Sequence, residues 1–148
     1  MKQTLFAAFV FLLIFPACRK NNTGSGEITG SWKLIEVYDK NTSTTSFPPA
    51  GSNKNVIISF ENGNRFSGHT LVNNFSDGTF TQNANKIIFE SFSMTKVMED
   101  QWGGSFLTVL NACPLQSVQP CVPSELTIQG KIMKIVSVLR YDIILEKQ

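Results

Sequence analysis

The side chains with the greatest capacity for chemistry in this 148-residue chain are one histidine, two adjacent acids and three cysteines. His69 has no second histidine or nearby cysteine, so it predicts neither a zinc site nor a Ser-His-Asp arrangement, and we expect an exposed strand residue. Glu99 and Asp100 could be the two carboxylates of a glycosidase, but acids at a helix start are explained by the helix macrodipole. No glycine-rich phosphate loop is present. We therefore expect no catalytic residue, metal or cofactor, and a protein that is not an enzyme.

The amino terminus predicts the location of the protein. A positive start precedes an apolar run, Leu5 to Phe15, which is too short to span a bilayer but typical of a signal peptide. The run ends in FPAC, which resembles the lipobox of bacterial lipoproteins and predicts acylation of Cys18, with palmitate among the chains. We expect a signal peptide at 1–17, a flexible polar tether at 18–29 and one domain at 30–148, anchored in the cell envelope at the outer membrane, on its periplasmic or surface face. The alternative is an ordinary secretory signal with an incidental cysteine.

Cys113 and Cys121 form an even pair in an oxidising compartment. They bracket a short loop closed by Pro114 and Pro120. A disulfide there would stabilise the fold by about 2.5 kcal/mol through loop entropy. A metal pair lacks further ligands nearby, and two free buried thiols are the remaining alternative.

The charge pattern indicates which partners to exclude. From Gly30 onward the chain carries ten Lys or Arg and ten Asp or Glu residues, without a basic stripe. A nucleic-acid partner is therefore not expected, because phosphate binding depends on clustered cations. The membrane, through Cys18, and an unidentified envelope protein are the expected partners, with a small apolar ligand as a further possibility.

Alternating apolar residues predict an antiparallel sheet. In the first strand, Trp32, Leu34 and Glu36 should share one face, and Val37 should lie on the other. Asn62–Asn64 reads as a tight hairpin turn, and Gly68 as a bulge in the return strand. The predicted elements are, in order, strands at 32–37, 56–61, 65–72, 79–82, 86–93, 125–130, 131–138 and 141–147, with a long polar loop at 39–55 and a turn at 73–78.

One amphipathic helix is expected between the hairpins. Apolar residues at spacings of three and four run through the segment from Thr95 to Cys113. Gly103 and Gly104 argue against a long regular helix, so we expect it to be firmest at 105–112. The fold class is therefore mainly β (α+β), an antiparallel sheet or partly open barrel of seven or eight strands with one mid-chain helix.

The order of these elements resembles the META domain of the HslJ type, found in many bacterial lipoproteins. The resemblance covers Gly30 to about Val138. It rests on three motifs. The first is the GSWKLIEV start, and the last is Thr95, Met98 and Glu99 before the helix. Between them lies a run that contains Ser67, Gly68, Asn74, Phe75, Ser76, Gly78 and Phe80. Where members of that family carry cysteines, this chain has Asn73 and Asp100. The resemblance implies a non-enzymatic, stress-related or assembly-related accessory protein.

The stretch ITGSWKLIEVYDK also resembles the first strand of lipocalin-type barrels, which implies a carrier of small apolar ligands. A helix placed between hairpins favours a compact domain with a filled interior, whereas a connected internal cavity of a few hundred Å³ would favour the ligand binder. Phe75, Phe80, Phe89 and Phe92 are expected in the core rather than on a sugar-stacking surface.

Two arrangements of the first tryptophan separate these interpretations. In lipocalin-type folds, an arginine of the closing strand covers this ring, and Arg140 is the candidate here. The arrangement that we favour buries Trp32 in a filled core with Leu34, covered by Phe106 and Leu110 of the helix.

Overall fold

The computed structural model describes residues 27–116 and 120–148. The predicted signal peptide at 1–17, Cys18 and most of the predicted tether lie outside these ranges. The elements are β1 (Gly30–Asp39), β2 (Thr44–Ser46), β3 (Ile57–Glu61), β4 (Arg65–His69), β5 (Asn74–Asn83), β6 (Lys86–Met94), α1 (Gln101–Leu110), α2 (Ala112–Leu115), β7 (Ser124–Gln129), β8 (Ile132–Val136) and β9 (Tyr141–Lys147).

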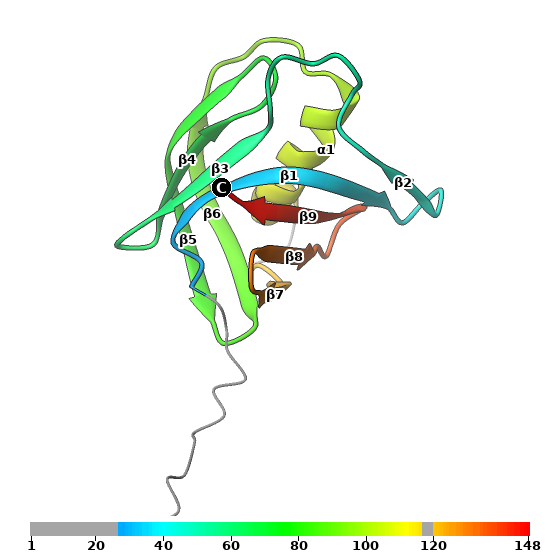
Figure 1. The fold of residues 1–148 in the computed structure, drawn as a ribbon. Coiled ribbons are helices and arrows are strands. Elements are labelled where there is room, and N and C mark those ends of the chain that lie inside the picture. The colour runs from blue at the N-terminus through cyan, green and yellow to red at the C-terminus, as the bar shows by residue number, and fades with distance from the viewer. Residues whose placement is uncertain (1–26, 117–119) are drawn as a thin grey trace, which may run out of the picture.

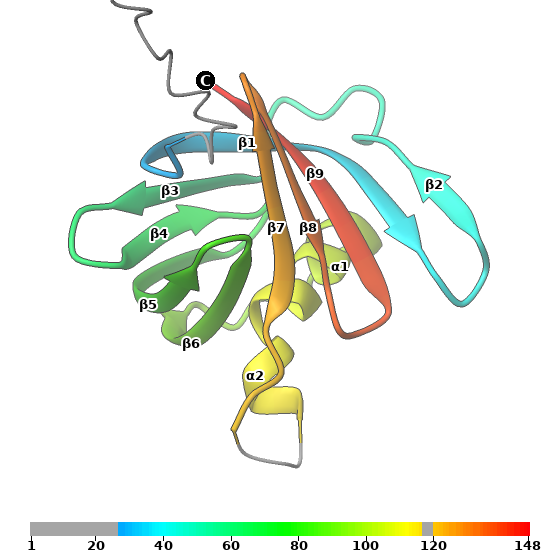
Figure 2. The ribbon, with the colours of Figure 1, turned by 90° about the horizontal axis from the view of Figure 1, so that it is seen from below.

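Eight strands close into an antiparallel barrel (Figures 1 and 2). The order is β1-β3-β4-β5-β6-β7-β8-β9, and pairing of β9 with β1 closes the ring. The weakest seam lies between β6 and β7, where only two residue pairs match. The short strand β2 adds to β1 outside the ring. The mainly β prediction with a mid-chain helix is thus confirmed.

Large side chains from the strands and from α1 fill the inside of the barrel. Trp32 and Phe106 are both 0% exposed and belong to one continuous core. Phe60 packs edge-to-face on Phe80 with ring centroids 5.1 Å apart, and Phe66 does so on Phe89 at 5.3 Å. Each such burial contributes about 1.5–3 kcal/mol. The core placement predicted for the four strand phenylalanines is confirmed: Phe75, Phe80 and Phe89 are buried, and Phe92 is partly buried against the core.

A bulge in β1 reverses the predicted alternation. Leu34 pairs with Leu145 and Glu36 with Ile144, so Ile35 is an extra residue in β1. Beyond the bulge, Val37 and Asp39 point inward and are buried, whereas Glu36 does not join the buried face. The prediction that Val37 lies on the face opposite Trp32 is therefore wrong.

Two loop predictions also need correction. The stretch at 73–78 lies largely within β5, where Asp77 has a φ of 55° beside register shifts, and the chain turns earlier, at 70–73. The polar loop at 39–55 contains β2. The Asn62–Asn64 turn is confirmed, with positive φ at Gly63 and Asn64, and so is the irregularity at Gly68.

Helix α1 begins four residues earlier than the firm part of the predicted helix. Asp100 is the N-cap, and its side chain accepts a hydrogen bond from the Gly103 N–H at 2.8 Å. The helix lies against β1 and β9 and buries Trp102, Phe106 and Leu110. Among the described residues, no helix is long and apolar enough to cross a bilayer.

Cys113 and Cys121 form the predicted disulfide, with Cα atoms 5.1 Å apart. Trp32 is buried as favoured above, and its indole N–H donates to the Ile28 carbonyl at 2.6 Å. The cation over its ring is Lys147, at the end of β9, with Nζ 5.4 Å from the ring centroid. The alternative that placed Arg140 over Trp32 is wrong, because Arg140 lies at the other end of β9 and pairs elsewhere.

Candidate functional site

The candidate site is a pocket of about 430 Å³ at the end of the barrel where β1 finishes and β9 begins. We call it the rim pocket. Its volume falls within the range of small-molecule sites. The residues that line it are Val37, Asp39, Thr44, Ser46, Phe47, Pro49, Leu71, Asp100, Gln101, Trp102, Ser105 and Tyr141.

The β1–β2 pairing sets one wall of the rim pocket. Val37 pairs with Ser46 and Asp39 with Thr44, so these four side chains lie on the same face of the two strands. Tyr38, between them, points to the opposite face and is 36% exposed. The sequence does not indicate this wall, because the short polar segment of β2 has no alternating apolar pattern.

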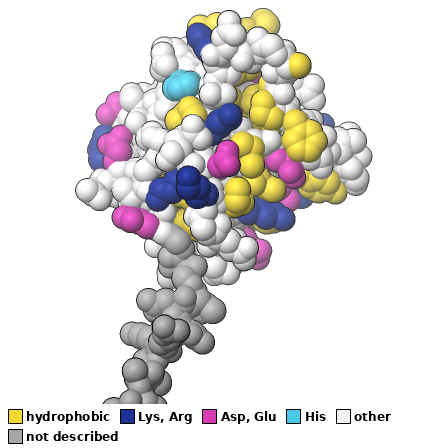
Figure 3. Space-filling view, viewed as in Figure 1, with side chains coloured by type: hydrophobic (Ala, Val, Ile, Leu, Met, Phe, Trp, Pro, Cys, Tyr) yellow, Lys and Arg dark blue, Asp and Glu magenta, His cyan; other side chains and the backbone are white. Residues whose placement is uncertain are grey.

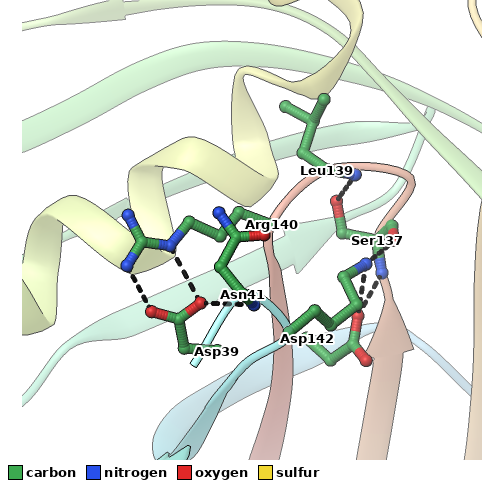
Figure 4. Close-up of polar contacts among 7 residues, drawn as sticks. Asp39, Asn41, Ser137, Leu139, Arg140 and Asp142 are labelled. Atoms are coloured by element: carbon green, nitrogen blue, oxygen red, sulfur yellow. Dashed lines mark hydrogen bonds and ion pairs between the residues drawn. The ribbon is translucent and has the colours of Figure 1, made fainter. Parts of the chain in front are cut away.

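An ion pair fixes the base of the rim pocket (Figure 4). Arg140 Nε donates to Asp39 Oδ1 at 2.8 Å, and Arg140 Nη2 bonds Oδ2. The Asn41 N–H also donates to Oδ1, at 2.9 Å. The hydrogen bonds from Arg140 are the main cause that lowers the pKa of Asp39 to about 2, against the opposing effect of burial. Asp39 is therefore ionised at every ordinary pH.

Neighbouring contacts hold the turn between β8 and β9 in place. Asp142 Oδ1 accepts from the Ser137 N–H at 3.0 Å and lies 3.2 Å from Lys40 Nζ, as Figure 4 shows in part. Lys40 Nζ also donates to the Ser137 carbonyl at 2.5 Å. The guanidinium of Arg140 lies 4.9 Å from the ring centroid of Tyr141, which faces the rim pocket. Hydrogen bonds and ion pairs thus hold the end of β1 against the start of β9.

A second polar network joins the other two walls. Glu99 Oε2 accepts from Thr70 Oγ1 at 2.7 Å and from Asn73 Nδ2 at 2.8 Å. Asn73 also accepts from the Val97 N–H and donates to the Val97 carbonyl, both at 2.8 Å. Since Leu71 lies between Thr70 and Asn73, this network ties the β4–β5 turn to the start of α1.

The space beside Glu99 is tightly filled. Its Oε1 atom is buried and has no hydrogen-bond partner among the described residues. A Cβ added at Gly103 would lie 2.4 Å from that atom, so a larger residue there would force the Glu99 side chain to move. Of the two acids predicted at the helix start, Asp100 caps α1, whereas the Glu99 side chain lies against Gly103 in the first turn of the helix and bonds to Thr70 and Asn73.

Several polar groups that line the rim pocket make no hydrogen bond with described residues. They are the Gln101 amide, the Tyr141 hydroxyl, the Ser46 hydroxyl and the Trp102 indole N–H. Both carboxylates of the pocket accept bonds from within the protein. The pocket thus combines aromatic rings with free donors and acceptors.

Other surfaces differ in character. A hollow of the same volume at the β5–β6 turn is lined by Thr81, Asn83, Ala84, Asn85, Lys86, Ile88 and Pro123, without an aromatic or acidic side chain. Figure 3 shows apolar side chains gathered on the outer face, with acids between them. On the outer face of β1, β8 and β9, Tyr38 and Ile132 are partly exposed.

The residues singled out from sequence do not all meet at the rim pocket. His69 is half-buried rather than exposed, with Nδ1 3.1 Å from the Thr70 carbonyl oxygen. Cys113 and Cys121 lie on and after α2, away from the pocket lining. In the described part of the chain, no three His, Cys, Asp or Glu side chains are grouped as metal ligands.

Comparison with known proteins identifies related folds only. No protein-family model and no curated protein matches the chain. A Burkholderia xenovorans protein solved by NMR is similar, with a TM-score of 0.58 and 15% identity over 80% of this chain and 81% of that one. A crystal structure of a DUF4847 family protein from Bacteroides vulgatus has a TM-score of 0.56 and 12% identity over 81% of this chain and 94% of its own.

Proposed function

We propose that the protein is a lipid-anchored envelope protein that holds a small ligand in the rim pocket without performing chemistry on it. The observation that carries this proposal is the pocket itself, in which two polar networks fix the walls from β1, β9, the β4–β5 turn and α1. Such fixed walls favour binding, because little conformational freedom is lost when a ligand enters. The filled barrel interior supports a site at the rim rather than the internal site of a lipocalin.

The position of the pocket agrees with an anchor at Cys18. The chain enters the barrel at Gly30, whereas the pocket begins at Val37 near the far end of β1. At about 3.3 Å per residue, the two ends of β1 lie roughly 30 Å apart. An anchored domain can therefore present the pocket to the aqueous side.

Fractionation tests the anchor. Cys18→Ala should move the protein from the membrane to the soluble fraction or leave the precursor uncleaved, because stable anchoring needs the acyl chains. Retention in membranes at an unchanged mature mass would contradict the anchor.

A second candidate is contact with another envelope protein, in line with the META-type resemblance. Exposed apolar side chains in the pocket lining and just before α1 favour it: Phe47 is 65%, Val97 57% and Met98 92% exposed. A photo-crosslinking residue at position 98 should then give one discrete adduct in cells, and the same residue at position 132 should not. The same set of several adducts at positions 98 and 132 would argue against a specific protein contact.

A further inference from the structure

We infer that the rim pocket takes a neutral, hydroxylated ligand with an apolar face, a mono- or disaccharide in class. This inference rests on the proposed function and adds the chemistry of the ligand. It follows from the charges, rings and free hydrogen-bonding groups that line the pocket.

The charges of the lining exclude a strongly charged ligand. No lysine or arginine is among the described residues that line the pocket, so an anion would find no direct cation partner. Asp39 is neutralised by Arg140, and the charge of Asp100 faces the amino-terminal end of α1, where the macrodipole offsets it. A cation would find Asp39 already paired with Arg140, and Asp100, whose charge the macrodipole offsets in part, as the one acid of the lining without an ion-pair partner among the described residues.

The same carboxylates argue against a purely apolar ligand. Asp39 is 8% exposed and ionised, and covering it with an apolar group would remove its remaining water without replacing the hydrogen bond. Asp39 already uses three of its roughly four acceptor sites. Asp100 uses one, for the Gly103 N–H, and is the main free acceptor for ligand hydroxyls.

The remaining lining complements a sugar. Phe47 and the half-buried Tyr141 supply rings for its C–H face, and Trp102, which is 7% exposed, adds a small part of the wall. Phe47, at 65% exposed, can close over a bound ring without loss of core packing. The Gln101 amide and the Tyr141 hydroxyl supply donors and acceptors. Aromatic faces beside free polar groups are what a neutral polyhydroxylated ring requires.

Binding to the mature protein in phosphatidylcholine vesicles tests the inference. The probes are methyl glycosides of the neutral hexoses and N-acetylhexosamines with their β-linked disaccharides, and hexanoate, hexylammonium and hexanol for the other classes. Calorimetry gives the Kd. Tryptophan emission reports the site, because Trp102 lines the pocket, whereas Trp32 is 0% exposed in the core.

We expect at least one glycoside to bind and to change the emission of the wild type but not of Trp102→Phe. Phe47→Ala should raise the Kd about tenfold, equivalent to 1.4 kcal/mol. Gln101→Ala should raise it about 2- to 12-fold through one lost hydrogen bond. Tyr38→Ala, on the opposite face of the same strand, is the matched control and should change the Kd by less than about twofold.

Each alternative outcome has a distinct meaning. Binding of hexanoate, hexylammonium or hexanol with the Trp102 signal, and of no glycoside, would overturn the ligand class and leave the proposed function standing. If glycosides bind but neither Phe47→Ala nor Gln101→Ala changes the Kd, the assignment of the glycoside site to the rim pocket would be overturned. Absence of binding by every probe would overturn this inference and the ligand-binding function together.

Discussion

Two adjacent glycines in α1 should respond in opposite ways to the same substitution. In an exposed helix interior, glycine to alanine stabilises by about 1 kcal/mol, from helix propensity. At Gly104 the nearest atom to an added Cβ is Glu99 Cγ at 3.8 Å, an ordinary contact, so Gly104→Ala should be stabilising by about 0.5–1 kcal/mol.

At Gly103 the added Cβ would lie 2.4 Å from Glu99 Oε1 and 2.6 Å from its Cδ. The Glu99 carboxylate must then move and give up its bonds to Thr70 and Asn73. Two hydrogen bonds to a charged group contribute at least about 3 kcal/mol together. After subtraction of the propensity gain, Gly103→Ala should lower the free energy of unfolding by about 2 kcal/mol.

Urea unfolding of the oxidised protein, followed by tryptophan emission, measures both variants. A double-mutant cycle adds the decisive control, because in the Glu99→Ala background the clash is gone and Gly103→Ala should be stabilising. If Gly103→Ala and Gly104→Ala were equally stabilising in the wild-type background, the reasoning on the Glu99 network would be refuted.

Three further predictions address the core, the ion pair and the disulfide. Trp32→Ala should lower the free energy of unfolding by about 3–5 kcal/mol through a cavity, measured by urea unfolding; a loss below about 1 kcal/mol would contradict a filled core. Since the pKa of Asp39 is lowered to about 2, its contribution is present above pH about 4 and is lost as the pH falls to about 2. Between pH about 4 and about 2, the free energy of unfolding should therefore fall less steeply for Asp39→Asn than for the wild type. Equal slopes for the two proteins would contradict the pairing with Arg140. Replacing Cys113 and Cys121 together by serine should cost about 2.5 kcal/mol, and thermal melts of the variant that match the wild type in oxidising buffer would contradict a structural role.

Local patterns in the sequence predict most of the barrel. Alternating apolar residues and the Asn-Gly turn predict β3, β4 and the three last strands, because a hairpin is specified by its own residues. The parity of the cysteines predicts the disulfide. The start of α1 is less evident from sequence, because Gly103 is typical of a helix end. In the structure, a glycine at this position instead leaves room for the Glu99 side chain.

Local sequence patterns do not predict most of the rim pocket. Asp39 and Arg140 are separated by 101 residues, and only closure of the barrel between β1 and β9 brings them together. Nothing in the local sequence distinguishes Asp39 from an ordinary solvated acid. The strand β2 owes its existence to pairing with β1 rather than to its own three polar residues.

The extra residue at Ile35 connects the fold to the site. Without it, strict alternation would place Tyr38 inward with Trp32 and Leu34 and turn Val37 and Asp39 toward solvent. With it, the first half of β1 supplies core, and the second half supplies the base of the rim pocket. Because aromatic side chains fill the interior, the rim pocket lies outside the core, where β1 runs past it toward β2 and α1. A single bulge therefore lets one strand serve both a closed core and an open site.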